Sequence, residues 1–211
     1  MWAVRRAIDR RTVCCRGLSA LLLLSASASP ATDEPASVVQ INGSPRVERG
    51  GKTSNLLVGM AVPLDAVVET DAKAKVKLRL ADGSALELGP KSRVTLREFV
   101  SEPPSRRARL QVLVGRFRLA IAPLVGGASD YEVRTPTAVA GVRGTVLWGD
   151  TDVDAICALE GHVEVRPLRG TSQPAQLETG QCVREMGKGR ALPFTPSPED
   201  LAKFLKQVTL D

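Results

Sequence analysis

Aromatic residues are scarce in this chain: one tyrosine, two tryptophans and four phenylalanines make up 3% of its 211 residues. Proteins that bind single-stranded nucleic acid stack the bases on aromatic faces, so the composition disfavours that class. A core with so few rings must be built from valine, leucine, isoleucine and alanine. Such a core suits thin layers of β-strands.

Histidine is almost absent as well, since His162 is the only one. It alternates with Val163 in an extended pattern, which predicts a side chain that points outward. No Ser-His-Asp or Cys-His arrangement can be assembled around it. We therefore expect no catalytic residue, no metal ligand and no cofactor, and a protein that is not an enzyme. An enzyme of an unfamiliar kind would need a deep pocket with converging titratable groups, and the sequence points to none.

The formal net charge of +6 is concentrated near the N-terminus. Residues 1–28 hold five arginines against one aspartate, so +4 of the +6 lies there and about +2 remains for the rest. A nearly balanced chain lacks the basic surface that nucleic-acid binding requires. No nucleic-acid partner is expected.

The apolar run near the N-terminus, residues 18–28, is also short: it has eleven residues, whereas a membrane-spanning helix needs roughly 20. The arginines before it and the small residues after it are typical of a signal peptide over residues 1–28, cleaved after Ala28 or after Ala31. This predicts export to the periplasm or secretion, with no stable membrane span after cleavage. The alternative is a retained N-terminal anchor, and two arginine pairs leave the twin-arginine route open.

Alternating strands dominate residues 38–190, after a linker at residues 29–37 that is rich in proline, serine and alanine. In the clearest strand, Val76, Leu78 and Leu80 alternate with lysine and arginine at a period of two. The basic side of this strand is expected to be a solvated face. Two prolines predict a loop at residues 102–109.

The stretch 131–148 interrupts a strand twice and then restarts it. Pro136 removes a backbone donor, and Gly141 and Gly144 predict a bulge or a close backbone approach. Units of strand, glycine corner and strand recur loosely elsewhere in the chain. The pattern predicts an all-β fold, either a β-solenoid or a bent β-sandwich of short strands.

Residues 191–211 form a tail of different character. Ser197 and Pro198 fit a helix N-terminus, and four apolar residues then recur at helical spacing: Leu201, Phe204, Leu205 and Val208. A short amphipathic helix is expected at residues 198–208. It would pack on its own domain or, alternatively, dock on a partner.

Three aspartates at alternate positions, Asp150, Asp152 and Asp154, resemble the start of a calcium loop. Ala155 stands where that loop needs glycine and Gly161 where it needs glutamate. We therefore expect a solvated hairpin turn rather than a calcium site.

Cys157 and Cys182 are the only cysteines that follow the expected cleavage site. An even pair in an exported chain predicts a disulfide, and two buried thiols are the alternative.

Residues 74–96, AKVKLRLADGSALELGPKSRVTL, resemble the first half of a FecR-type periplasmic domain. In that family an alternating strand runs into Asp-Gly-Ser, here Asp82, Gly83 and Ser84, then a second strand and a serine before a third. A second signature is matched by Arg134, Thr135 and Pro136, followed by Gly144 and Thr145. Residues 159–165 and 177–181 resemble the closing strands. The resemblance covers roughly residues 38–185.

The resemblance implies a β-rich periplasmic domain without catalytic activity, whose signature residues set the backbone path. The best-known members are membrane-spanning regulators of iron uptake that sense an outer-membrane receptor and control a sigma factor from a cytosolic domain. Here only about seventeen residues precede the apolar run. We therefore expect an exported module that binds an envelope protein or glycan, with addition of a partner strand to a sheet edge as a reasonable mode. The alternative is an anchored periplasmic component of sigma-factor signalling.

Overall fold

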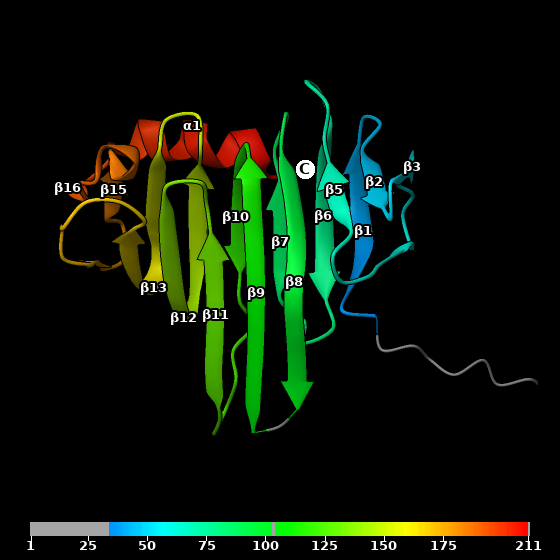
Figure 1. Cartoon of the computed structure of the whole chain (residues 1–211), viewed down its shortest axis with the longest axis horizontal. Helices are drawn as coiled ribbons and strands as arrows, with labels where there is room; N and C mark the ends of the chain where they lie inside the picture. Colours follow the sequence, from blue (N-terminus) through cyan, green and yellow to red (C-terminus); the bar gives the residue numbers. More distant parts are fainter. Residues whose placement is uncertain (1–33, 103, 211) are drawn as a thin grey trace, which may run out of the picture. The chain divides into compact units, whose positions relative to one another are not determined.

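The computed structural model describes residues 34–102 and 104–210, except the side chains of residues 143–145. The expected signal peptide at 1–28 and the first part of the linker at 29–37 lie outside the described residues. The described chain forms one mixed sheet of 16 strands that bends over on itself, together with a 3-10 helix, η1 (Met186–Lys188), and an α-helix, α1 (Pro198–Val208) (Figure 1).

The strands divide into two facing layers. The first layer contains β1 (Ala36–Asn42), β4 (Ala61–Val62), β6 (Lys75–Leu80), β7 (Ala85–Leu88) and β10 (Arg116–Ala120). The second layer contains β2 (Arg46–Arg49), β3 (Lys52–Asn55), β5 (Val67–Glu69), β8 (Arg93–Glu102), β9 (Ser105–Val114) and β11 (Ala128–Arg134). Figure 1 shows β8, β9 and β11 in front of β7 and β10.

The long strand β12 (Ala138–Asp150) joins the two layers. Its first half pairs with β11 and its second half pairs with β10. Its register with β13 (Ala155–Pro167) shifts between Arg143 and Leu147, in the region where the glycines predicted a bulge. β13 pairs with β12 along most of its length. Its other side pairs with β14 (Ala175–Leu177) and β15 (Cys182–Arg184), and β15 pairs in turn with β16 (Leu192–Phe194).

The prediction of an all-β fold with a C-terminal helix is confirmed, in the form of the bent sandwich. All described strand pairs are antiparallel except β9 with β11, whereas a solenoid would stack parallel strands. The sheet does not close, because β3 and β4 stand at the ends of the strand order.

The core between the layers is aliphatic, as the composition predicted. Leu78 and Leu86 from the first layer line the same small internal space as Val94 and Leu110 from the second. Phe117 and Tyr131 are the fully buried rings of this cluster.

The loop expected at residues 102–109 is wrong, because β8 runs to Glu102 and β9 begins at Ser105. Ala108, Leu110 and Val112 are buried on one face of β9, and Arg106 continues that inward-facing series toward the N-terminal end of the strand. Because Arg106 is charged at an inward-facing position, the alternation of apolar and polar residues in β9 could not be recognised in the sequence.

The expected helix is confirmed as α1. The Asp200 backbone N–H donates to Ser197 Oγ at 3.2 Å, which caps the N-terminus. α1 lies on its own domain, behind β10, β12 and β13 near the top of Figure 1. No helix within the described ranges has the length and hydropathy of a membrane span.

Candidate interaction surface

The turn Asp82-Gly83-Ser84 joins β6 to β7. Gly83 has φ +86°, a conformation that glycine adopts readily, and the Ser84 N–H donates to Asp82 Oδ1 at 3.0 Å. Local turn chemistry therefore accounts for these three residue types, as the sequence indicated.

The same turn is also the centre of a buried polar cluster that sequence reasoning missed. Arg106 Nη1 lies 2.9 Å from Asp82 Oδ2, and Tyr131 Oη donates to the same oxygen. Ser84 Oγ lies 3.1 Å from Tyr131 Oη and accepts the Ala122 N–H at 3.0 Å. Burial, with the Asp82 carboxylate second, raises the pKa of Tyr131 well above its usual range. The cluster ties β6, β9, β10 and β11 together at one end of the sandwich.

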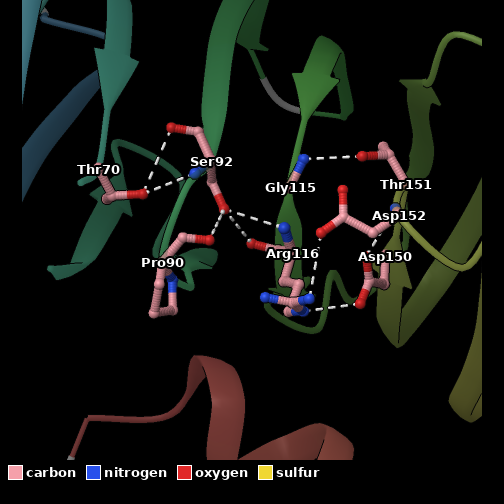
Figure 2. Close-up of polar contacts among 8 residues, drawn as sticks. All are labelled: Thr70, Pro90, Ser92, Gly115, Arg116, Asp150, Thr151 and Asp152. Atoms are coloured by element: carbon pink, nitrogen blue, oxygen red, sulfur yellow. Dashed lines mark hydrogen bonds and ion pairs between the residues drawn. The ribbon is translucent and has the colours of Figure 1, made fainter. Parts of the chain in front are cut away.

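A second buried serine, Ser92, anchors the opposite end of β10 (Figure 2). Its hydroxyl donates to the Arg116 carbonyl at 3.0 Å and accepts the Arg116 N–H at 2.9 Å. Its own N–H donates to Thr70 Oγ1 at 2.8 Å, and that hydroxyl donates to the Gly89 carbonyl at 2.6 Å. Ser84 and Ser92 therefore fix β10 at its two ends.

Arg116 connects this cluster to two aspartates at the end of β12, Asp150 within the strand and Asp152 after it, as Figure 2 shows. Its Nε donates to Asp150 Oδ2 at 2.7 Å, and its Nη2 donates to Asp152 Oδ2 at 3.1 Å. The expected solvated turn is wrong for Asp150, which is buried against Arg116. Asp152 is half exposed. Asp154 accepts from Thr137 Oγ1 and the Gly187 N–H, both at 2.6 Å.

The second signature forms the corner between β11 and β12. Thr135 is buried, and its hydroxyl accepts the Ala138 N–H at 3.0 Å while its own N–H donates to the Ala138 carbonyl at 2.9 Å. Pro136 lies in the turn, and Arg134 is exposed at the end of β11. Gly144 and Thr145 lie in β12, where the register shifts.

Cys157 and Cys182 form a disulfide, so that prediction is confirmed. They lie directly opposite each other on β13 and β15, on the outer face of the sheet. Trp148, opposite Cys157 on β12, stacks on Phe204 of α1 with the ring centroids 4.5 Å apart. Trp148, both cysteines and Val208 are buried together, so α1 covers the disulfide.

The remaining candidates do not assemble into a catalytic or metal site. His162 is exposed as expected, and its Nε2 lies 2.7 Å from Glu178 Oε2. A surface hollow of about 620 Å³ is lined by Asp130, Gly141, His162, Glu164 and Gln176. Each titratable group there has its own partner: Arg109 for Asp130, and Arg166 with Gln176 for Glu164. Among the described residues, no group of His, Cys, Asp and Glu could hold a metal ion.

Ion pairs cover the outer face of the second layer. Three arginines from β8 and β9 take part: Arg97 with Asp65 at 2.9 Å, Arg107 with Asp130 at 3.2 Å, and Arg109 with the same carboxylate. The charges of these arginines are therefore balanced by carboxylates on the same face.

One strand of this layer extends past its neighbour. β5 pairs with β8 only along Arg93, Val94 and Thr95, and the last backbone contact on that side is Asp65 N–H to the Leu96 carbonyl at 3.0 Å. In the described parts of the chain, no strand pairs with this side of β8 at residues 98–102, which we call the β8 open edge. Figure 1 shows this end of the β8–β9 hairpin projecting beyond the strands of the first layer.

The outer face of the β8 open edge carries two carboxylates, of which Glu98 lies 3.5 Å from Arg107 of β9. Glu98, Val100 and Glu102 share the outer face, since they pair with Arg109, Arg107 and Ser105 of β9. Phe99 faces inward and packs against the core. Arg106, inward on β9, holds the projecting part of the hairpin to the Asp82 cluster. Residues 98–102 of β8 are therefore held in place through β9 and Arg106, and their other side lacks a strand partner in the described chain.

Comparison with known proteins gives a fold and a family. No curated protein matches the chain. Two crystal structures of a candidate anti-sigma factor from Parabacteroides distasonis, at 1.65 and 2.50 Å resolution, share its fold with TM-scores of 0.51 and 0.52 and 16% sequence identity each. Each covers 66% of this chain, whereas this chain covers 64% and 63% of theirs, less than two thirds of their length.

The family model for the FecR protein matches residues 66–171. This segment runs from before β5 to beyond β13, and includes the Asp82 turn, Ser92, the Thr135 corner and the β8 open edge. The two signatures of the resemblance, the Asp82 turn and the Thr135 corner, fall inside the match, whereas residues 177–181 lie beyond it. The chain belongs to the FecR family.

Proposed function

We propose that this protein is an exported, non-catalytic component of envelope signalling that binds a partner protein by accepting an extended strand along the β8 open edge. The observation that carries the proposal is the unpaired side of residues 98–102 on a hairpin held by a buried ion pair. Exposed strand edges recruit partner strands through main-chain hydrogen bonds. Membership of the FecR family and the anti-sigma description of the protein that shares the fold support the signalling role.

The partner strand is expected to carry basic residues on one face and apolar residues on the other. Basic side chains would meet Glu98 and Glu102 on the outer face, and β-branched or aromatic ones would lie beside Phe99 on the inner face. The disulfide supports an oxidising compartment, the periplasm. Export would follow cleavage of residues 1–28, leaving the linker at 29–37, the β domain at 38–190 and the tail at 191–211. Retention of the N-terminal segment as an anchor is the alternative.

Site-specific photo-crosslinking in the native cells tests the edge. A photoreactive residue at Val100 of the full chain should capture one envelope protein, and the same adduct should form at Glu102. Val114 provides a matched control, because it is 39% exposed against 40% for Val100 but lies at the far end of β9. Equal adducts at Val114, or none at the edge, would count against strand addition.

Intact mass of the protein recovered from the envelope tests export separately. A chain that begins at Ser29 or Thr32, two hydrogens lighter than its reduced form, is expected. A chain that still carries Met1 would favour the anchored alternative.

A further inference from the structure

The turn at residues 56–60 presents apolar side chains to solvent. It links β3 in the second layer to β4 in the first, and closes one end of the sandwich. Leu56 fills the core with 3% of its surface exposed, but Leu57 and Val58 are 62% and 63% exposed. Val39, 38% exposed, follows Val38, whose carbonyl contacts the turn. Leu57, Val58 and Val39 thus place exposed apolar side chains near one another, and contiguous apolar surface is typical of interaction sites when the patch is large.

The backbone holds this turn in a fixed position. The Leu56 N–H donates to the Pro45 carbonyl at 2.9 Å, and the Gly59 N–H donates to the Val38 carbonyl at 2.8 Å. Met60 N–H closes the turn on the Leu57 carbonyl at 3.1 Å. Leu57 and Val58 are therefore displayed by strands β1 and β2 rather than by a loose loop.

Basic residues accompany the apolar ones, and the two carboxylates that flank this stretch, Glu48 and Asp65, are paired with Arg93 and Arg97. Residues 49–64 contain Arg49 and Lys52 but no aspartate or glutamate. Both cations are exposed and form no ion pair within the described ranges. Lys52 lies three residues along β3 from Asn55, about 10 Å from the start of the turn. Arg79 on β6 is exposed opposite Ser37, which in turn pairs with Ala61 at the end of the turn.

The chain enters the domain beside this turn. Ala36 pairs with Val62, and the Val38 N–H donates to the Met60 carbonyl at 2.9 Å. The arginine-rich and apolar N-terminal segment ends at residue 28, and the seven residues at 29–35 span at most about 25 Å when extended. The bilayer in which a signal peptide is cleaved or an anchor is retained is thus within reach of the turn.

We propose that the turn at residues 56–60 is a membrane-surface contact: Leu57 and Val58 enter the boundary between headgroups and acyl chains of an anionic bilayer, with Arg49, Lys52 and Arg79 facing the phosphates. Combined apolar insertion and basic charge are the two signals that reversible membrane binding requires. A protein partner would also cover the apolar pair, but the absence of carboxylates over residues 49–64 and the entry of the chain at Ala36, which pairs with Val62, favour lipid.

Vesicle sedimentation tests the proposal with protein purified from cells that express the full chain. We expect binding to vesicles of phosphatidylethanolamine and phosphatidylglycerol, and weaker binding to phosphatidylcholine alone. The double variant Leu57→Asp/Val58→Asp should lose about tenfold or more in partitioning, because two apolar side chains can no longer be buried. The double variant Arg49→Gln/Lys52→Gln should lose several-fold on anionic vesicles only, as should added salt.

Val125→Asp is the matched control, since Val125 is 97% exposed in the separate loop at residues 123–127 and should leave partitioning unchanged. Equal binding by the Leu57/Val58 and Val125 variants would overturn the proposal. The proposal would also be overturned if the Leu57/Val58 variant still bound vesicles but lost a protein adduct or self-association. Crosslinking at Val100 does not depend on this turn, so the two proposals can fail separately.

Discussion

Arg106 and Asp82 form an ion pair inside the protein, with 2.9 Å between Nη1 and Oδ2 and only 4% and 2% of their side chains exposed. The pair joins the projecting half of β9 to the turn before β7. A buried charge of this kind needs its partner, because removal of either member leaves the other uncompensated in a medium of low polarity.

Substitution Arg106→Met should therefore lower the free energy of unfolding by about 3–5 kcal/mol, measured by urea denaturation. The matched control is Arg97→Met, which breaks a pair of the same length with Asp65 on the exposed face of β8. That change should cost no more than about 1 kcal/mol. Similar losses for the two variants would mean that burial of the Arg106–Asp82 pair has no energetic consequence.

Tyr131 should remain protonated far into the alkaline range. Burial and the Asp82 carboxylate raise its pKa above the ordinary value of about 10. A raised pKa in the folded state means that the contribution of this phenol to stability is complete below about pH 10 and declines as the pH rises further. Tyr131 is the only tyrosine, so tyrosinate absorbance reports on it alone.

In an alkaline titration we expect tyrosinate absorbance to appear together with the loss of folded circular dichroism. The variant Tyr131→Phe should give no absorbance change and confirms the assignment. An absorbance transition near pH 10 in protein that is still folded would contradict the buried cluster.

Two buried hydroxyls on or next to β8 should respond in opposite ways to removal. Ser92 Oγ accepts the Arg116 N–H and donates to its carbonyl, so Ser92→Ala removes the acceptor of the Arg116 N–H, whereas the carbonyl still accepts the Gly89 N–H. A loss of about 1–3 kcal/mol is expected in urea unfolding. Thr95 is 1% exposed, and its Oγ1 has no hydrogen-bond partner among the described residues. Thr95→Val keeps the shape and should be neutral or stabilising by up to about 1 kcal/mol.

A loss of stability in Thr95→Val equal to that in Ser92→Ala would show that the hydroxyl of Thr95 is satisfied in solution. The contrast between the two variants is the useful quantity, because they are three residues apart in the same region.

The local features of this fold could be predicted from the sequence, because they depend on neighbours in the chain. The alternation in β6, the turn at Asp82 and the cap at Ser197 are of this kind. The disulfide between Cys157 and Cys182 spans 25 residues and could be predicted only because these are the two cysteines after the expected cleavage site. The Asp82 cluster could not be predicted in the same way. Its partner Arg106 lies 24 residues further along, at a core position where the pattern demanded an apolar residue.

The β8 open edge could not be predicted from the sequence either. It exists because β5 begins only at Val67, opposite Thr95, and pairs with just the first three residues of β8; relative strand lengths are set by tertiary pairing. The burial of Asp150 has the same origin, since its partner Arg116 comes from a strand that becomes its neighbour only in the folded sheet. The resemblance to the FecR family located the signature residues but not these contacts.

Helix α1 should protect the disulfide from reductants. Cys157 and Cys182 are 1% and 0% exposed beneath Trp148, Phe204 and Val208. Thiol–disulfide exchange needs access to a sulfur atom, so undocking of α1 should be required before attack. Phe204→Asp removes the stacked ring and places a charge in the apolar contact, and should raise the rate of reduction by about tenfold or more. The readout is mass spectrometry after timed reduction and alkylation.

Ala202→Asp is the matched control, because Ala202 is on the exposed side of the same helix. It introduces the same charge without touching Trp148, so its rate of reduction should equal that of the unchanged protein. Trp148 is the one tryptophan of the described residues, and its fluorescence should shift to the red in Phe204→Asp alone. If Phe204→Asp exposes Trp148 but its disulfide is reduced as slowly as that of the parent protein, then the sheet itself protects the disulfide. Faster reduction with exposed Trp148 would make α1 the element that keeps this bond closed.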